Sequence, residues 1–315
     1  MPTGAPSLLC PIDFSEFSRQ ALGYAAAIAG HFGARLIVVS VDDPLLVEAA
    51  EDAGIDPPPA VELRSAMEAF CGDTLTSFTG PLTVEYVVAV GKPATEILRV
   101  ARERGVELIV ISSHGRSGMR KVFFGSTTER VLRETTVPVL VTREWRHPFT
   151  SLSELARHIT RVVAPVDLTE ESLHHLVIAQ GIATALSARL LAVHVIEPLF
   201  VPYRVRAALP GAEQARRSRA EEKLAAMISR VGGAHPPELI VLLGEPAEEI
   251  VKLAEARNAG LIVMGLHSSG PLASRMGSTT YRVLCQTEAL VLTVPPHVVK
   301  ATSRRMAAAT QAAAR

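Results

Sequence analysis

Aromatic residues are scarce in this chain: they make up 4% of its 315 residues, and a single tryptophan is present. Hydrophobic residues nevertheless reach 48%, so any core must be built mainly from Ala, Val, Leu and Ile. This composition is typical of a globular protein and excludes a disordered chain. The length exceeds the usual size of one core, which favours two domains of about 150 residues each.

Cysteine is almost as scarce, and its distribution excludes two classes of protein. Cys10, Cys71 and Cys285 form an odd set without the paired spacing of a zinc site, so neither a disulfide framework nor a metal centre is expected. The first residues have neither a basic start nor a long apolar core, unlike a secretory leader. The apolar runs are much shorter than the roughly 18 residues of a membrane span. We therefore expect a reduced, cytoplasmic protein in which Cys10 is an inert thiol within a buried strand.

The chain also lacks an excess of either charge. Its 32 basic and 32 acidic residues give a formal net charge of zero. A general binder of nucleic acid or of anionic membranes needs a strong positive field. Neither nucleic acid nor membrane is therefore expected as a partner, although local basic loops remain compatible with this balance.

What the sequence does contain is a long internal repeat. The stretch "LLCPIDFSEFSRQAL" is matched by "VVAPVDLTEESLHHL", which aligns Asp13 with Asp167, 154 positions later. Towards the end of each half, "FGSTTERVLR" is matched by "MGSTTYRVLC", which aligns Gly125 with Gly277 at 152 positions. Long matches in the same order and at a nearly constant offset indicate a duplicated domain.

Each half alternates short β-branched runs with helical patterns, which predicts a parallel sheet covered by helices. The predicted fold class is α/β, with two tandem Rossmann-like repeats, each an open five-stranded parallel sheet with helices on both faces. In the first half we expect helices from residue 15 to 31, ending before Gly33, and from 93 to 104, ending at Gly105. The strands are expected at residues 8–13, 35–41, 82–90, 108–112 and 138–142.

The chain divides into segments of different composition. We predict a first domain at residues 1–145, a linker at 146–160, a second domain at 161–296 and an Ala-rich tail at 297–315. Each domain has a segment rich in turn-forming residues after its second strand, at 42–60 and 197–212. Each of these segments is either a lid or a surface excursion.

A loop in the first half combines glycines, cations and hydroxyls, in the stretch "SHGRSGMRKVFFGSTTER". It follows the fourth predicted strand, and in an open parallel sheet ligands bind beyond the carboxyl ends of the strands. Backbone amides at the following helix start favour an anion. Arg116 adds positive charge, Gly115 and Gly125 would allow a phosphate close to the backbone, and Ser126 could donate its hydroxyl.

Simpler explanations of the same residues remain open. Ser126 and Glu129 match the S-x-x-E capping box, which begins a helix without any ligand. Asp13 ends the first strand, where its carboxylate would accept hydrogen bonds from a ribose or help to start the next helix. Ser15 is a second candidate cap for that helix.

The histidines suggest no metal site. His114 is explained as well by a local hydrogen bond as by a ligand contact. His174 and His175 are expected on a helix surface, where adjacent residues face different ways and do not form a metal-binding pair.

Taken with these residues, the chain resembles the universal stress protein family, in its tandem two-domain form, over nearly its whole length. The resemblance rests on "PIDFSEFSRQAL", on "SHGRSG", and on "GSTTERVLR" followed by "VPVLV". It implies an adenine nucleotide alpha hydrolase-like version of the fold. Family members that bind nucleotides carry G-x-x-G, nine residues, and then G-S or G-T. Gly115, nine residues, Gly125 and Ser126 fit this pattern, but Ser112 stands where its first glycine belongs.

The resemblance also implies individual roles. Asp13 would hold the ribose or adenine side of a nucleotide, and the backbone at Val41 would contact adenine. The phosphates would be surrounded by Gly115, Arg116, Gly125, Ser126 and Thr127. If Ser112 must adopt a left-handed conformation, the penalty is about 1 to 2 kcal/mol, or roughly one decade in affinity. If Ser112 keeps a strand conformation, its side chain could instead crowd the ligand.

The second half departs further from the family pattern. Ser268 stands at the position of Gly115, and only eight residues (269 to 276) separate it from Gly277. Arg275 is the sole cation in that interval. The residues that persist on the ligand side are Asp167, Val195, Gly265, Gly277 and Ser278. We expect the second domain to bind nucleotide weakly or not at all, with its adenosine end less damaged than its phosphate end.

Three functions compete. The first is a regulatory protein that binds ATP or a related adenine nucleotide, with or without Mg, in the first domain. The second is an interaction module in which neither site is filled. The third is a slow ATPase or nucleotidyl transferase, which is least favoured because no P-loop and no magnesium-binding acidic pair is found.

The resemblance extends to assembly. In this family the fifth strands commonly mediate pairing, and here they would be residues 138–142 and 290–294. An exposed apolar edge strand would otherwise favour aggregation. The two halves are therefore expected to pair with each other as an internal pseudo-dimer, or with a second chain as a homodimer.

Overall fold

The computed structural model describes residues 5–54, 58–76, 78, 81–114, 125–143, 151–198, 211–233, 235–266 and 276–295. The chain divides into two compact units, Met1–Leu155 and Ala156–Arg315. The Ala-rich tail at 297–315 lies outside the described residues.

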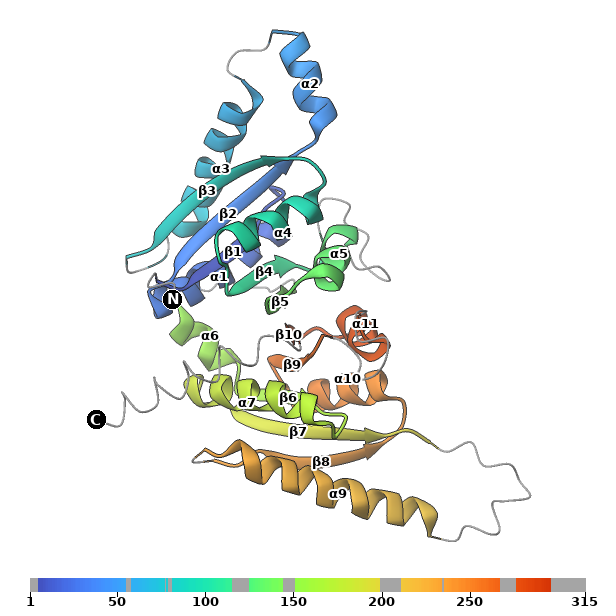
Figure 1. Ribbon diagram of the computed structural model, residues 1–315. Coiled ribbons are helices and arrows are strands. Elements are labelled where there is room, and N and C mark those ends of the chain that lie inside the picture. Colours follow the sequence, from blue (N-terminus) through green and yellow to red (C-terminus); the bar gives the residue numbers. More distant parts are fainter. Residues whose placement is uncertain are drawn as a thin grey trace, which may run out of the picture. The chain divides into compact units, whose positions relative to one another are not determined.

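The first unit contains an open sheet whose strand order is β3-β2-β1-β4-β5 (Figure 1). Every neighbouring pair is parallel, from the β1–β2 register of Cys10 against Val38 to the β4–β5 register of Ser112 against Thr142. The strands are β1 (Ser7–Pro11), β2 (Arg35–Asp42), β3 (Thr83–Val90), β4 (Leu108–Ser112) and β5 (Val139–Thr142). The predicted parallel α/β sheet is therefore confirmed, with strand ends that differ from the prediction by at most two residues.

Helices connect these strands and cover both faces of the sheet. They are α1 (Glu16–Phe32), α2 (Pro44–Asp52), α3 (Pro59–Leu75), α4 (Pro93–Glu103) and α5 (Ser126–Glu134). α1 packs on α3 and α4 packs on α5 (Figure 1). The predicted helix ends are confirmed, because Gly33 and Gly105 adopt left-handed φ values of 59° and 60° just after α1 and α4. The sequence did not predict α2, which begins within the segment at 42–60.

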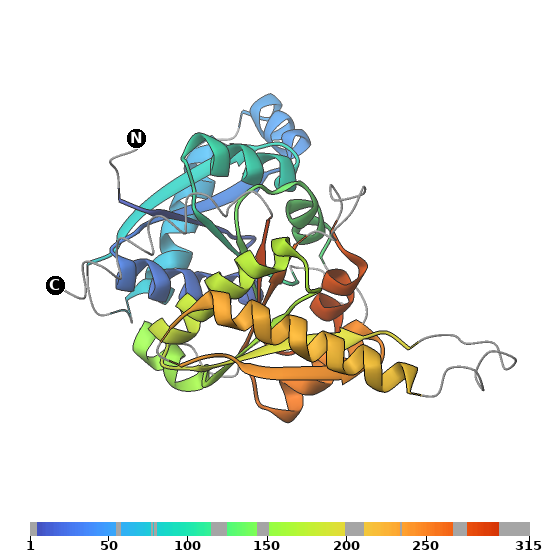
Figure 2. The same cartoon turned by 60° about the horizontal axis from the view of Figure 1, so that its bottom comes forward.

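The second unit repeats this order as β8-β7-β6-β9-β10. Its strands are β6 (Arg161–Pro165), β7 (Arg189–Ile196), β8 (Glu238–Leu243), β9 (Leu261–Gly265) and β10 (Leu290–Val294). Its helices are α7 (Glu170–Ala185), α9 (Ala212–Val231), α10 (Pro246–Ala256) and α11 (Ser278–Gln286), and α6 (Leu152–His158) precedes β6. Figure 2 shows α9 running along β7 and β8, which it contacts. Within the described ranges, no helix combines the length and the apolar character needed to cross a membrane.

The central strands form the core of each unit. All five residues of β1 are buried, since helices cover the sheet on both sides. Cys10 is fully buried in β1, and this burial, followed by the nearby Cys71, raises the pKa of its thiol. Burial also raises the pKa of Cys71 to about 11. Both thiols are therefore protonated at neutral pH, as expected for the inert Cys10.

The third strand of each unit is followed by a glycine that a side chain would obstruct. Gly91 follows β3 with a φ of 147°, and Gly244 follows β8 with a φ of 155°. A Cβ atom at Gly244 would lie 2.6 Å from Cγ of Glu249, in the first turn of α10. Both the backbone conformation and the close approach of the helix therefore require glycine.

Replacing this glycine by alanine should destabilise the second unit. We expect Gly244→Ala to lower the free energy of unfolding by about 1 to 3 kcal/mol, because alanine strains the backbone and displaces Glu249. Gly23→Ala in α1 is the control, since its Cβ would meet nothing within 4 Å. That variant should be as stable as the wild type or up to about 1 kcal/mol more stable. Urea unfolding followed by circular dichroism measures both, and a Gly244→Ala variant of wild-type stability would contradict this account.

Candidate functional site

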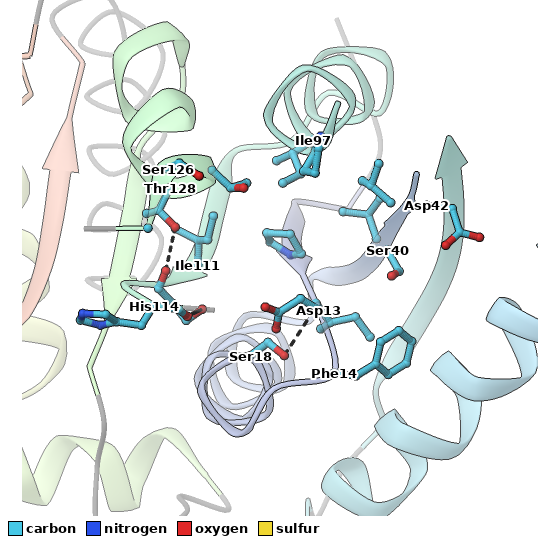
Figure 3. A pocket seen from close by; sticks show the side chains of 18 of the residues that line it. Asp13, Phe14, Ser18, Ser40, Asp42, Ile97, Ile111, His114, Ser126 and Thr128 are labelled. Atoms are coloured by element: carbon cyan, nitrogen blue, oxygen red, sulfur yellow. Dashed lines mark hydrogen bonds between the residues drawn. The ribbon is translucent and has the colours of Figure 1, made fainter. Parts of the chain in front are cut away.

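A cavity of about 470 Å³ lies at the carboxyl ends of the strands of the first unit (Figure 3). We call it the first cavity. Its lining comes from the ends of β1, β2 and β4, from α3, and from the starts of α4 and α5. Figure 3 shows the side chains of Asp13, Ser40 and Ile97 around this space, whereas the ring of His114 lies away from them. The duplicated sheet therefore forms a cavity where ligands of open α/β proteins usually bind.

Asp13 is held in place by the turn that begins α1. Its Oδ1 accepts hydrogen bonds from the Ser15 backbone N–H at 3.1 Å and from the Ser15 hydroxyl at 2.5 Å. Ser15 is the N-cap of α1 and accepts from the N–H of Ser18 at 3.2 Å. Between Asp13 and Ser15, Phe14 takes a left-handed φ of 63°. Ser15 therefore caps α1, and Asp13 helps to start this helix by orienting Ser15. Asp13 also lines the first cavity.

Ser112 keeps an ordinary strand conformation. It is the last residue of β4 and is not one of the described residues with positive φ, so the hypothesis of a left-handed Ser112 is wrong. Gly265, at the same place in β9, does not have a positive φ either. The Ser112 hydroxyl donates to the carbonyl of His114 at 2.7 Å, which holds it against the loop backbone. The backbone conformation at this position is therefore open to residues other than glycine in both units.

The start of α5 differs from the predicted capping box. The N-cap is Gly125, and the N–H of Glu129 donates to the Gly125 carbonyl at 2.9 Å. The Glu129 carboxylate pairs with Arg133 at 2.6 Å instead of reaching back to Ser126. The capping-box explanation of Ser126 and Glu129 is therefore wrong, because the helix begins one residue too early for Ser126 to be its cap.

A helix capped by glycine leaves its first amides available. Helix geometry gives the first N–H groups no partner within the helix, and Gly125 has no side chain that could accept from them. Residues 126–128, which carry these N–H groups, line the first cavity. The helix is anchored there, since the Thr128 hydroxyl donates to the Ser112 carbonyl at 2.8 Å. Such a helix start attracts anions.

The structure brings most of the predicted residues of the first half into one cavity. Those that line it are Asp13, Val41, Ser112, Gly125, Ser126 and Thr127. Gly115 and Arg116 lie outside the described residues. The sequence analysis missed the apolar wall formed by Phe14, Leu63 and Ile97, of which only Ile97 lies within a helix whose range was predicted. It also missed Asp42, where burial, followed by the Asp43 carboxylate, raises the pKa of the carboxyl group.

His114 makes local contacts, which was one of the two roles weighed for it in the sequence analysis. Its Nδ1 lies 2.9 Å from the Ser113 hydroxyl. Its ring centroid is 5.7 Å from that of Phe17 on α1. These contacts account for the position of the His114 ring without a ligand, although His114 is one of the residues that line the first cavity.

The second unit has an equivalent cavity of about 340 Å³, the second cavity. The predicted residues that line it are Asp167, Gly265, Gly277, Val195 and Ser278. The turn chemistry is repeated, since Asp167 accepts from the N–H of Thr169 at 3.1 Å and Thr169 caps α7. α11 also begins after a glycine N-cap, Gly277. Ser268 and Arg275 lie outside the described residues.

Two histidines line the second cavity where the repeat places Ala21 and Ser40 in the first unit. The ring Nε2–H of His175 donates to the Pro165 carbonyl at 2.9 Å. The ring Nδ1–H of His194 donates to the Val166 carbonyl, also at 2.9 Å. His175 is buried, so the prediction that it lies on a helix surface is wrong: α7 turns this face towards β6. Burial lowers the pKa of His175 below its ordinary value.

Comparison with known proteins gives a consistent result. The model of the universal stress protein family matches residues 6–143 and 158–295 of this chain. The universal stress protein YxiE of Bacillus subtilis strain 168 is 32% identical over 144 residues, which cover 43% of this chain and 97% of that protein. The match to YxiE therefore corresponds to about one repeat.

Solved structures match nearly the whole chain. The protein PA1789 of Pseudomonas aeruginosa PAO1 has a TM-score of 0.64 at 19% identity, covering 96% of this chain and 98% of its own. A universal stress protein from Archaeoglobus fulgidus DSM 4304 has a TM-score of 0.60 at 21% identity, covering 93% of this chain and 99% of its own. At these identities the two structures show a shared fold with two repeats.

Substituting His175 by glutamine should remove part of the acid sensitivity of the second unit. Because burial lowers the folded-state pKa, the unfolded chain takes up a proton first as the pH falls below about 6.5, the ordinary histidine pKa. The stability that the neutral ring contributes is present above this pH and is lost as the pH falls through it. Between about pH 7.5 and 5.5, the melting temperature of the wild type should therefore fall more steeply than that of His175→Gln.

His174→Gln is the matched control for this measurement. His174 is the neighbouring residue on α7 but is only half-buried. This variant should keep the wild-type dependence of melting temperature on pH. If His175→Gln keeps it as well, the buried ring makes no contribution to acid sensitivity.

Proposed function

The chain belongs to the universal stress protein family, and we propose that its first unit binds ATP or a related adenine nucleotide as a regulatory ligand, while its second unit binds nucleotide weakly or not at all. One observation carries this proposal. The first cavity places an oriented carboxylate, Asp13, and a glycine-capped helix start, at Gly125, around the same space. A nucleotide needs both kinds of group, because it has hydroxyls on its sugar and negative charge on its phosphates.

The rest of the first cavity suits the remaining part of an adenine nucleotide. Its volume of about 470 Å³ lies within the range of small-molecule sites. Phe14, Leu63 and Ile97 provide apolar surface for a base, and Val41 offers backbone groups at the end of β2. In this arrangement the base lies near β2, the ribose near Asp13 and the phosphates at the start of α5. The cations of the loop after His114 would add to the attraction for phosphate.

Ser112 does not oppose this proposal. The free-energy penalty of a left-handed serine does not arise, because Ser112 keeps the conformation of the strand. Its hydroxyl is held by the His114 carbonyl, at 2.7 Å, and so is oriented by the protein itself. The departure from the glycine of the family pattern therefore carries no left-handed backbone penalty, and the Ser112 side chain is one of the groups that a ligand in the first cavity would meet.

The second cavity is less suited to the same ligand. It is smaller, at about 340 Å³, and two imidazole rings line it where the first unit has alanine and serine. The loop that should hold phosphate is one residue shorter between Ser268 and Gly277, and Arg275 is its only cation. Fewer amide donors and less charge weaken a phosphate site.

A magnesium ion in the first cavity would be bound mainly through the nucleotide. The two carboxylates that line the first cavity are Asp13 and Asp42. Among the residues that the structure describes, no three His, Cys, Asp or Glu side chains form a metal-binding group. Phosphate oxygens of the nucleotide, together with water, would therefore supply most of the ligands of a bound magnesium ion.

The first test is the nucleotide content of the protein. Freshly purified protein, and protein incubated with excess ATP and magnesium and then desalted, is denatured, and the released nucleotide is quantified by chromatography and mass spectrometry. We expect close to one adenine nucleotide per chain. Two per chain would contradict the proposal for the second unit, and none in either preparation would favour an interaction module with empty sites.

A pair of matched variants tests the site itself. Asp13→Asn keeps the oxygen that accepts from Ser15 but removes the negative charge, so the fold should persist while ATP binding weakens about tenfold. Asp167→Asn makes the same change in the equivalent turn of the second unit. It should leave the affinity for ATP unchanged in isothermal titration calorimetry. If Asp167→Asn weakens binding as much as Asp13→Asn does, the ligand is not held where we propose.

A further inference from the structure

A shallow groove of about 450 Å³ lies beside α9 in the second unit. We call it the α9 groove, and its lining residues are Leu168, His194, Val195, Ile196, Glu197, Arg216, Arg219, Ala220 and Lys223. It shares His194, Val195 and Glu197 with the second cavity. The two hollows are therefore neighbours across the end of β7.

Helical spacing places the cations of α9 along the α9 groove. Arg216, Arg219 and Lys223 are three and four residues apart, so they lie on the same side of the helix. Ala220 is buried between them and Leu224 is buried next to Lys223, which places the cations at the border of the face that packs on β7 and β8. In Figure 2, α9 lies along these strands. The cations thus form one wall of the α9 groove.

One of these cations is already oriented by the protein. The Nη2 atom of Arg216 donates to the carbonyl of Glu197 at 2.9 Å. This bond ties α9 to the end of β7 and holds the guanidinium at the α9 groove. A guanidinium that is fixed before a ligand arrives loses less conformational freedom on binding.

The other two cations of the α9 groove, Arg219 and Lys223, differ in their ion pairing from the cations of α9 outside the groove. Arg217 pairs with Glu221 at 3.0 Å, and Arg230 pairs with Glu170 at 2.6 Å. Among the residues that the structure describes, Arg219 and Lys223 have no carboxylate partner. Among its lining residues, Glu197 carries the one carboxylate, whereas three residues carry a cation. The α9 groove therefore carries an excess of positive charge in a protein whose formal net charge is zero.

The first unit has no such cations in the equivalent place. The buried residues of α3 include Met67 and Phe70, and those of α9 include Leu224 and Met227 with the same spacing. This register aligns Glu62 and Ala66 of α3 with Arg219 and Lys223 of α9. The positive charge at this place therefore distinguishes the second copy from the first, and the general need to cover the sheet with a helix does not explain it.

We propose that the α9 groove binds the phosphate groups of a small anion, and that an attached ring, where the ligand has one, occupies the second cavity, so that a nucleotide in the second unit is bound weakly and through the α9 groove instead of the start of α11. Arginine guanidinium groups favour phosphate because two N–H donors match two of its oxygens. The shared residues make one ligand able to reach both hollows, with His194 at their junction. The inference does not depend on a nucleotide in the first cavity. A nucleotide and inorganic polyphosphate both carry the phosphate groups that the α9 groove would bind.

The five lysines of the chain allow a local test. Methylation with ¹³C-formaldehyde keeps their charge and gives separate NMR signals for Lys223 and for Lys121 in the glycine loop of the first unit. Lys223→Arg identifies the Lys223 signal by its loss. The full-length protein is titrated with inorganic tripolyphosphate and, separately, with ATP. Because Lys121 reports on the first unit and Lys223 on the second, failure of one proposal is distinguishable from failure of the other.

We expect a saturable shift of the Lys223 signal. Arg219→Gln should weaken the binding detected at Lys223 roughly tenfold. Arg217→Gln, which removes a cation from the same helix outside the α9 groove, should change it less than about twofold. A shift with tripolyphosphate alone would show that phosphate groups suffice, and a shift with ATP only would show that the ring in the second cavity is required.

Two results would overturn the proposal. One is a Lys223 signal that responds to neither ligand. The other is equal weakening by Arg217→Gln and Arg219→Gln, because the shift would then reflect general attraction between a polyanion and a basic helix.

Discussion

Burial of a parallel sheet on both faces is the constraint on which the rest of this structure depends. Each strand must be followed by a crossover helix that returns to the starting edge, so every strand points the same way. Their carboxyl ends therefore meet at one edge, where the chain turns and polar side chains can gather. The first cavity lies at this edge, with Asp13 after β1, Val41 in β2 and Ser112 at the end of β4.

The two kinds of helix start at that edge have different consequences. α1 and α7 follow an Asp-x-Ser or Asp-x-Thr turn, in which the aspartate orients a hydroxyl that caps the helix. Their first amides are thus partly satisfied by the protein. α5 and α11 begin after glycine caps, which provide no side-chain acceptor. The same edge therefore carries a fixed carboxylate and a helix start without a side-chain cap, and the proposed nucleotide site rests on this pairing.

Duplication provides an internal comparison of what the fold needs and what a ligand needs. Both units keep the aspartate turn, the glycine after the third strand and the glycine cap of the last helix, and the backbone conformation requires glycine only after the third strand. They differ in groups that face the hollows: His175 and His194 line the second cavity, and the cations of α9 line the neighbouring groove. The features shared by both copies thus form a common frame at the sheet edge, and the features confined to one copy are where the ligands of the two units would differ.

The sequence by itself determined the duplicated α/β sheet, the positions of the strands and the helix ends at Gly33 and Gly105, because these depend on periodicity and on backbone preferences of a few neighbouring residues. Only the tertiary structure decided that Ser112 stays in the strand, that Gly125 and not Ser126 caps α5, and that His175 is buried. It also decided that three cations of α9 share a groove with β7. Each of these depends on which distant segment packs against the residue, and no local pattern carries that information.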